Sequence, residues 1–271
     1  MKRFLSVLIS LLLLMSPVFA AENENALQPV RVALIDTGIS PVAIDISRIA
    51  EGKNYAIPDR DTADVLGHGT ALAGLILDAA PDAILVPLVY CTKSANGTIV
   101  QCSVNTVAKI IRDAVDAYNC RVINISARFP KDVPELRDAI AYAEERGAVV
   151  VASVGNTNRT EPWLSYYPAS YDTVIGVGAL RKDGNVASFS QRHGVSIVAP
   201  GDALKVVNPQ GYTTTASGTS YATAQVTGAV AALLAESPGL TPEQVRDHLF
   251  SNAKDFGPDG YDSDTGYGAL R

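Results

Sequence analysis

Two kinds of hydrophobic pattern alternate along this chain. Short apolar runs rich in β-branched residues predict strands, and they cover Val30–Ile35, Ile84–Val89, Arg121–Ile125, Ala148–Ala152, Thr173–Val177 and Val195–Val198. Longer segments with helical spacing predict helices at Thr70–Leu77, Val104–Tyr118, Pro134–Arg146, Tyr221–Ala235 and Pro242–Ser251. Strands that alternate with helices are typical of a parallel sheet covered by helices. The pattern therefore predicts an α/β fold with a mainly parallel sheet.

Local signals support two helix starts and add one hairpin. Thr241 is followed by a proline, and Pro134 is followed by an acidic residue, which favours the first turn of a helix in both places. Residues 205–208 and 212–215 flank a Pro-Gln-Gly turn, which predicts a β-hairpin. Because no internal repeat, low-complexity tract or long linker interrupts the sequence, we interpret residues 30–271 as one domain.

The first twenty residues have the composition of a secretory signal peptide. Two basic residues precede an apolar stretch from Phe4 to Leu14, and small residues lead to a cleavage site after Ala20. A membrane anchor is the alternative, but the stretch is roughly half as long as the ~20 residues that a bilayer requires. We therefore predict a signal peptide over 1–20, a short stub over 21–29, and a secreted or periplasmic protein without a membrane anchor.

Composition and charge narrow the classes of partner. The chain has 271 residues, of which 47% are hydrophobic and 18% charged, as is usual for a globular domain with a substantial core. Its formal net charge is -6, and no run of Lys and Arg offsets this locally. A nucleic-acid binder needs a basic face for phosphates, so nucleic acid is excluded as a partner.

Three cysteines fit an oxidising compartment without forming a disulfide scaffold. Cys91 and Cys102 flank a Lys-Ser-Ala-Asn-Gly-Thr loop signal, so the favoured disulfide closes this loop and leaves Cys120 over. The other pairings stay open. None of the three lies in a recognisable nucleophile context, which disfavours a catalytic cysteine.

Asp36 and His68 are the first candidates for chemistry. Asp36 follows the first apolar strand directly, and catalytic groups in an open α/β sheet gather beyond the carboxyl ends of strands. The alternative is a turn-forming aspartate before Thr-Gly. His68 is flanked by glycines, which leave its ring uncrowded at a helix start, although a lone histidine is more often structural.

Ser220 and Asn156 are the next candidates. Ser220 begins a helix that is apolar on nearly every face and should be buried. Free N–H groups and the helix dipole stabilise negative charge there. The alternative for Ser220 is a helix N-cap. Asn156 follows a buried strand, where its amide can donate to an oxyanion, or it is a turn-forming residue.

The order Asp36, His68, Ser220 along the chain matches one known triad arrangement. It is accompanied by the motifs Ile35-Asp36-Thr37-Gly38, Gly67-His68-Gly69-Thr70 with Ala73-Gly74, Val122-Ile123-Asn124-Ile125-Ser126, Gly155-Asn156, Tyr167-Pro168-Ala169-Ser170, Val177-Gly178-Ala179, Phe189-Ser190, Ala199-Pro200-Gly201, and Ser217-Gly218-Thr219-Ser220 with Ala222-Thr223. In these motifs the sequence resembles the subtilisin-like serine proteases, the subtilases (peptidase family S8), from Val30 almost to the C-terminus.

The resemblance implies a three-layer α/β sandwich in which 30–271 is the catalytic domain of a serine endopeptidase that works through an acyl-enzyme. It implies Ser220 as nucleophile, His68 as general base and Asp36 as the residue that fixes the histidine tautomer. By the same resemblance, the oxyanion hole comprises Asn156, the Ser220 N–H and Thr219. Six residues are implied to flank the substrate pocket: Ser126, Ala127, Arg128, Ser153, Val154 and Gly155. The expected partner is a protein or peptide substrate, and no cofactor is expected.

The chain departs from the family pattern around the site. Ala71 stands where a second histidine is usual, and Ala224-Gln225 replaces a usual Pro-His pair, so we expect tuning of the chemistry rather than its loss. The small residues and glycine usual after the Asn-x-Ser segment are replaced by Ala127-Arg128-Phe129-Pro130. Specificity is therefore not carried over, and Arg128 either favours an acidic substrate residue or is simply solvated.

Two further expectations concern a propeptide and calcium. About ten residues separate the predicted cleavage site from the first strand, so we expect either unaided folding or a separate chaperone or inhibitor protein. Asp255, Asp259, Asp262 and Asp264 crowd a glycine-rich segment, but their order lacks the spacing of a calcium loop. A solvated turn is favoured there over a structural calcium site.

Other functional classes fit less well. A second Asp-Thr-Gly at Asp264 would pair with Asp36 in an aspartic protease, yet no strands follow it to build the second half of such a site. The main alternative is a catalytically inactive subtilase that binds peptides, which the altered segment at 127–130 keeps open. A dinucleotide-binding module is disfavoured because no Gly-x-Gly-x-x-Gly follows the first strand.

Overall fold

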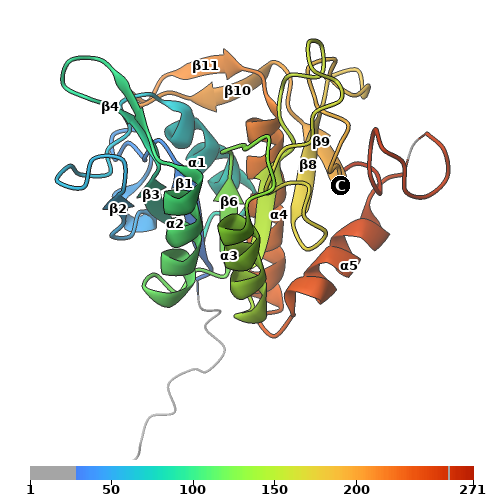
Figure 1. Ribbon diagram of the computed structural model, residues 1–271, viewed down its shortest axis with the longest axis horizontal. Helices are drawn as coiled ribbons and strands as arrows, with labels where there is room; N and C mark the ends of the chain where they lie inside the picture. Colours follow the sequence, from blue (N-terminus) through green and yellow to red (C-terminus); the bar gives the residue numbers. More distant parts are fainter. Residues whose placement is uncertain (1–28, 256) are drawn as a thin grey trace, which may run out of the picture.

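The computed structural model describes residues 29–255 and 257–271, so the predicted signal peptide and all but the last residue of the predicted stub lie outside the described residues. The described chain is built around a seven-stranded sheet with strand order β2-β3-β1-β6-β7-β8-β9 (Figure 1). Its strands are β1 Arg31–Asp36, β2 Lys53–Asn54, β3 Ile84–Val89, β6 Val122–Ile125, β7 Val149–Ser153, β8 Ile175–Leu180 and β9 Ile197–Pro200. Every neighbouring pair in the sheet is parallel.

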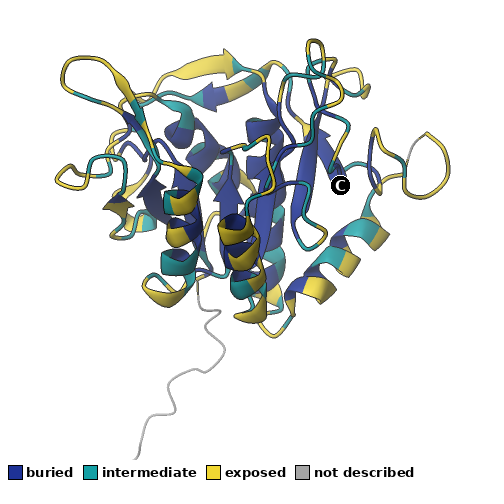
Figure 2. Ribbon diagram, in the orientation of Figure 1, coloured by how far each residue is buried: buried dark blue, intermediate teal, exposed yellow. Residues whose placement is uncertain are grey.

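Helices cover both faces of the sheet. On one face lie α1 His68–Ala79, α4 Thr219–Glu236 and α5 Pro242–Asn252, and on the other lie α2 Val104–Asp116 and α3 Pro134–Glu145. The alternation within β1 shows why both faces are apolar: Val32 and Leu34 join the core under α1 and α4, whereas Ala33 and Ile35 join the core under α2 and α3. Figure 2 shows the buried strands behind α2 and α3, whose outward faces are exposed. The predicted three-layer α/β sandwich is confirmed.

Helix α4 is buried to an unusual extent. Its own side chains are small or apolar on nearly every face, and it packs against α1 and against β6, β7, β8 and β9. The approach to α1 is so close that a Cβ at Gly228 would lie 2.7 Å from the Cβ of Ala79. This packing sets the position of the first turn of α4 relative to the sheet. Despite the apolar character of α4, no helix in the described ranges combines the length and hydropathy needed to cross a membrane.

The predicted elements are all present, with ends that differ by at most three residues. The predicted hairpin is also present, as antiparallel strands β10 Leu204–Val207 and β11 Thr213–Ala216. The sequence did not predict β2, the 3-10 turn Ile46–Arg48, or the hairpin of β4 Cys91–Lys93 and β5 Ile99–Gln101. Elements of two or three residues are too short to show a hydrophobic period.

The β4–β5 hairpin also decides the state of the cysteines. Its register places Cys91 opposite Gln101, while the Cys102 N–H donates to the Tyr90 carbonyl. Neighbouring strand residues point to opposite sides, so Cys91 and Cys102 do not face each other. The expected disulfide between them is therefore wrong, and all three cysteines are free thiols. Burial raises the pKa of Cys102 to about 11 and that of Cys120 to about 12, which keeps both thiols protonated.

Candidate active site

The residues singled out in the sequence meet at the carboxyl edge of the sheet. Asp36 is the last residue of β1, Ser126 follows β6 directly, and Asn156 comes shortly after β7. Two helices begin at the same edge, with His68 as the first residue of α1 and Ser220 in the first turn of α4. Because parallel strands end at a common edge, side chains far apart in the sequence converge there.

A short hydrogen bond joins Asp36 to His68. Asp36 Oδ1 lies 2.7 Å from His68 Nδ1 and also accepts from the Thr37 N–H at 2.8 Å. Asp36 is 1% exposed, whereas the His68 side chain is 34% exposed. Because a carboxylate accepts from Nδ1, the neutral ring carries its proton there and leaves Nε2 as the basic nitrogen. His68 therefore presents a proton acceptor to the open side of the edge.

Nearby carboxylates set the protonation of His68. Burial acts to lower the pKa of His68, but the charge and hydrogen bond of Asp36, together with the charge of Asp64, raise it above its ordinary value. A histidine acts as a base only when it is neutral. Any activity that needs this base is therefore lost as the pH falls through the raised pKa.

The glycines beside His68 allow α1 to begin against the end of β1. A Cβ at Gly69 would lie 2.2 Å from the Gly38 carbonyl oxygen and 3.3 Å from Asp36 Oδ1. Gly67, with φ 91°, adopts a left-handed conformation that side chains disfavour. In the Gly-His-Gly motif, Gly69 thus allows the close backbone approach, and Gly67 allows the left-handed backbone conformation.

Ser220 lies in the first turn of α4, and the residue that follows it contacts the histidine. It is 8% exposed, and the ring of the following residue, Tyr221, meets the His68 ring edge-on with centroids 5.6 Å apart. The N-cap position of α4 is Gly218, so the N-cap alternative for Ser220 does not hold. Within the described residues His68 Nε2 has no hydrogen-bond partner. Such contacts often form only when substrate is bound.

Asn156 is oriented by the start of α4. Its Oδ1 accepts from the Thr219 N–H and the Thr219 hydroxyl, both at 2.9 Å. Since an N–H can only donate, the acceptor must be the amide oxygen, which leaves Nδ2 to point elsewhere. Asn156 is exposed, and its Nδ2 would lie 3.3 Å from a Cβ placed on Gly218. The hydroxyl of Thr219 is thus engaged in holding Asn156, and Nδ2 has no hydrogen-bond partner among the described residues.

Asp64 is a buried carboxylate that the sequence analysis did not single out. Its two oxygens accept five hydrogen bonds, from the Thr37 hydroxyl, the N–H groups of Leu66, Gly67 and Thr70, and the Thr70 hydroxyl. The Thr37 oxygen in turn accepts from the Gly69 N–H at 2.8 Å. Asp64 therefore fixes the loop that delivers His68 to Asp36. An acidic residue a few positions before a helix start was the available sequence signal.

Replacement of Asp64 tests this positioning role. Asp64→Asn removes one acceptor oxygen and one charge, so we expect a loss of about 2 kcal/mol in the free energy of unfolding. We expect kcat/KM to fall about 10-fold because His68 is displaced, and its acid limb to move to lower pH because the charge no longer raises the pKa of His68. Denaturant unfolding and a pH profile measure these effects. Asp59→Asn, an exposed acid in the same loop, is the control, and equal effects in both variants would contradict the role.

The six predicted pocket residues form two walls. Ile125 pairs with Ala152 in the sheet register, so the segments 126–128 and 153–155 leave neighbouring strands side by side. Ala127, Ser153 and Val154 are buried, whereas Arg128 is exposed. The Ser126 hydroxyl is buried and has no hydrogen-bond partner among the described residues. The walls therefore bring one unpartnered hydroxyl and one exposed guanidinium to this edge.

The acidic residues near the C-terminus are engaged in their own turn. Asp262 accepts from the Asp264 N–H and the Thr265 hydroxyl, and Asp255 accepts from the Gly260 N–H. Asp264 also forms an ion pair with Arg192 and takes no part in the Asp36 cluster. In the part of the chain that the structure describes, no group of three or more His, Cys, Asp or Glu side chains is arranged to hold a metal ion.

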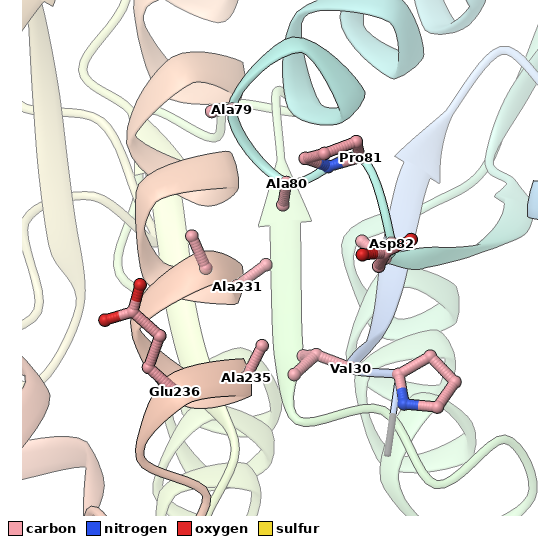
Figure 3. Close-up of a pocket in the computed structure, with 11 residues that line it drawn as sticks. Val30, Ala79, Ala80, Pro81, Asp82, Ala231, Ala235 and Glu236 are labelled. Atoms are coloured by element: carbon pink, nitrogen blue, oxygen red, sulfur yellow. The ribbon is translucent and has the colours of Figure 1, made fainter. Parts of the chain in front are cut away.

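The pocket drawn in Figure 3 lies at the opposite edge of the sheet. It forms where β1 begins and where α1 and α4 end, and its walls are mainly alanines with Val30. Its titratable lining residues are Asp82 and Glu236. Because it is lined by no nucleophile or histidine, we assign the chemistry to the carboxyl edge.

Comparison with known proteins identifies relatives over most of the chain. The sequence matches the subtilase family over residues 28–268. It is 32% identical over 243 residues to subtilisin DY of Bacillus licheniformis, covering 86% of each chain. It is 34% identical over 238 residues to subtilisin Savinase of Lederbergia lenta, covering 84% of each chain. Among solved structures, fervidolysin from Fervidobacterium pennivorans superposes with a TM-score of 0.78 and 32% identity, over 90% of this chain and 42% of that one.

Proposed function

This chain belongs to the subtilase family of serine endopeptidases, and we propose that Ser220, His68 and Asp36 hydrolyse peptide bonds through an acyl-enzyme. The observation that carries the proposal is the 2.7 Å contact between the buried Asp36 carboxylate and His68, at the edge where α4 presents Ser220. Labelling with an organophosphonate tests it. We expect one covalent adduct, on Ser220, and a native protein that takes up no label would contradict the proposal.

In the first half of the reaction, the Ser220 oxygen attacks the carbonyl carbon of the substrate. Its proton passes to His68 Nε2, and the charged ring is stabilised by its Nδ1–H bond to Asp36. The carbon–nitrogen bond then breaks as the proton on Nε2 passes to the departing amine. The acyl group remains on Ser220 as an ester.

In the second half, water hydrolyses the ester. The water oxygen bonds to the acyl carbon while His68 takes its proton, and the bond to the Ser220 oxygen then breaks as that oxygen regains a proton. Both halves place negative charge on the carbonyl oxygen. We propose that Asn156 Nδ2 and the N–H of Ser220 donate hydrogen bonds to this oxygen. Ser220 lies in the first turn of α4, where backbone N–H groups have no partner within the helix.

Loss of the Asn156 amide should slow the chemical step. For Asn156→Ala we expect kcat to fall about 10²–10³-fold, as found for the oxyanion donor of subtilisin, with KM little changed because the charge develops only in the transition state. Asn158→Ala, which truncates the same side chain two positions further on, is expected to keep native kcat. Steady-state kinetics on one peptide decides, and equal kcat in both variants would show that another group binds the oxyanion.

A catalytically inactive subtilase that binds peptides remains the alternative function. The altered segment at 127–130 is its sole support, whereas the Asp36–His68 bond and the orientation of Asn156 both favour catalysis. We also propose that the protein is exported to the periplasm or medium, and that it either folds unaided or relies on a separate inhibitor or chaperone protein. N-terminal sequencing of the protein recovered from each cell fraction checks the export, and a protein found only inside the cell with residues 1–20 still attached would contradict it.

A further inference from the structure

A tyrosine that the mechanism does not use lies between the two pocket walls. Phe129 and Tyr167 exchange backbone hydrogen bonds of 2.9 Å in both directions. This antiparallel bridge draws the segment that contains Tyr166 alongside the wall formed by 126–128. Tyr166 itself is 5% exposed, so its ring is covered within the protein.

The ring of Tyr166 packs against the other wall. A Cβ at Gly155 would lie 2.7 Å from Cδ2 and 3.0 Å from Cε2 of this ring, so the ring sits directly on the Gly155 backbone. The Tyr166 hydroxyl lies 2.9 Å from the Thr157 hydroxyl and 3.5 Å from a Glu161 carboxylate oxygen. Contacts at its face and at its hydroxyl therefore hold the ring in the space between the walls.

Arg128 stands over the same ring. Its guanidinium carbon lies 5.3 Å from the centre of the Tyr166 ring, a cation–π contact. Arg128 is exposed and belongs to none of the ion pairs formed by the described residues. The space between the walls is therefore occupied by an aromatic ring, and its exposed wall carries a guanidinium without an ion-pair partner among the described residues.

We propose that Tyr166 closes the pocket for the substrate residue that precedes the cleaved bond and so favours a short side chain there. We further propose that Arg128 favours an acidic side chain at the same position. This inference rests on the proposed function and names its substrate class. A large aromatic or long aliphatic side chain has to displace a packed, hydrogen-bonded ring, which disfavours it. A carboxylate instead meets a guanidinium that has no other ionic partner, which favours it.

A set of four peptides tests the floor of the pocket. They are internally quenched, identical except for Ala, Glu, Phe or Lys before the cleaved bond, and their products are identified by mass. For the native protein we expect kcat/KM for Ala and Glu to exceed that for Phe and Lys by about 10–100-fold. Tyr166→Gly should raise the Phe-to-Ala ratio by a similar factor, whereas Tyr166→Phe keeps the ring and should keep the native order.

The same peptides test Arg128. Arg128→Gln should lower the Glu-to-Ala ratio about 3-fold, the size expected for one solvent-exposed ion pair. Arg112→Gln is the matched control, since that guanidinium lies 4.6 Å from the ring centre of Tyr142 on the α2–α3 surface.

A native enzyme that cleaves after Phe as fast as after Ala overturns the role of Tyr166, and an unchanged ratio in Arg128→Gln overturns that of Arg128. A native protein that cleaves no peptide and takes up no phosphonate instead overturns the proposed function, and this inference with it.

Discussion

The Ser220→Ala protein is expected to fold normally and to lose about 10⁶-fold in kcat, the size of loss found when subtilisin loses its triad serine. The reason is chemical: without the hydroxyl no acyl-enzyme forms, and only water attack assisted by the oxyanion site remains. Removal of one hydroxyl from a small side chain leaves the packing of α4 intact. Hydrolysis of a quenched peptide and uptake of an organophosphonate measure the loss, and both should vanish together.

Ser217→Ala is the matched control for this prediction. Ser217 is an exposed serine three positions earlier, and its hydroxyl donates to Asp202 at 2.7 Å. We expect this variant to keep both hydrolysis and labelling. Residual activity in Ser220→Ala that matches the native enzyme would show that a different residue is the nucleophile, whatever the labelling result.

The Asp36→Asn protein should lose about 10⁴-fold in kcat, as in other serine triads that lose this carboxylate. An amide in place of the carboxylate can donate its N–H to His68 Nδ1, which then moves the proton of the ring to Nε2. The nitrogen that must accept the serine proton is then already protonated. The imidazolium formed during the reaction also loses the charge that stabilises it.

The pH dependence of Asp36→Asn gives a second, independent readout. The Asp36 charge raises the pKa of His68 in the native protein, so native kcat/KM is lost as the pH falls through that raised value. Without this charge the pKa of His68 falls, and the residual activity should persist to lower pH. Profiles between about pH 5 and 8 cover the titration of histidine. Asp78→Asn, an exposed acid on the same helix as His68, should keep the native profile, and an unshifted acid limb in Asp36→Asn would contradict the coupling.

The arrangement of strands and helices followed from local patterns. Strand β3, at Ile84–Val89, was predicted with its observed ends because a buried strand is apolar over its whole length. The start of α4 was predicted two residues late because Thr219 and Ser220 are small polar residues that show no helical hydrophobic pattern. The β4–β5 hairpin was read as a loop, and the disulfide expected there failed because the strand register turns Cys91 and Cys102 apart.

Some residues of the candidate site were also predicted from the sequence, and others were not. Asp36, His68, Asn156 and Ser220 stand out because each interrupts an apolar element at its end, where a polar residue has no packing role. Asp64 and Tyr166 lie in irregular segments, and each has a key contact far away in the sequence: Asp64 accepts from the Thr37 hydroxyl, and the Arg128 guanidinium lies over the Tyr166 ring. No periodicity marks such residues, because their importance lies in contacts that form only after the chain has folded.

The sequence by itself determined the α/β class, the succession of elements and the candidates for the triad, because hydrophobic period, strand ends and motifs are local properties of the chain. Tertiary structure alone decided which carboxylate holds the histidine loop, that the amide oxygen of Asn156 rather than its nitrogen faces α4, and which ring packs between the segments 126–128 and 153–155. Those outcomes depend on the order of parallel strands in the sheet and on the buried contacts of α4. Such contacts join residues separated by tens of positions, as Thr219 and Asn156 are, and no local pattern records their distance.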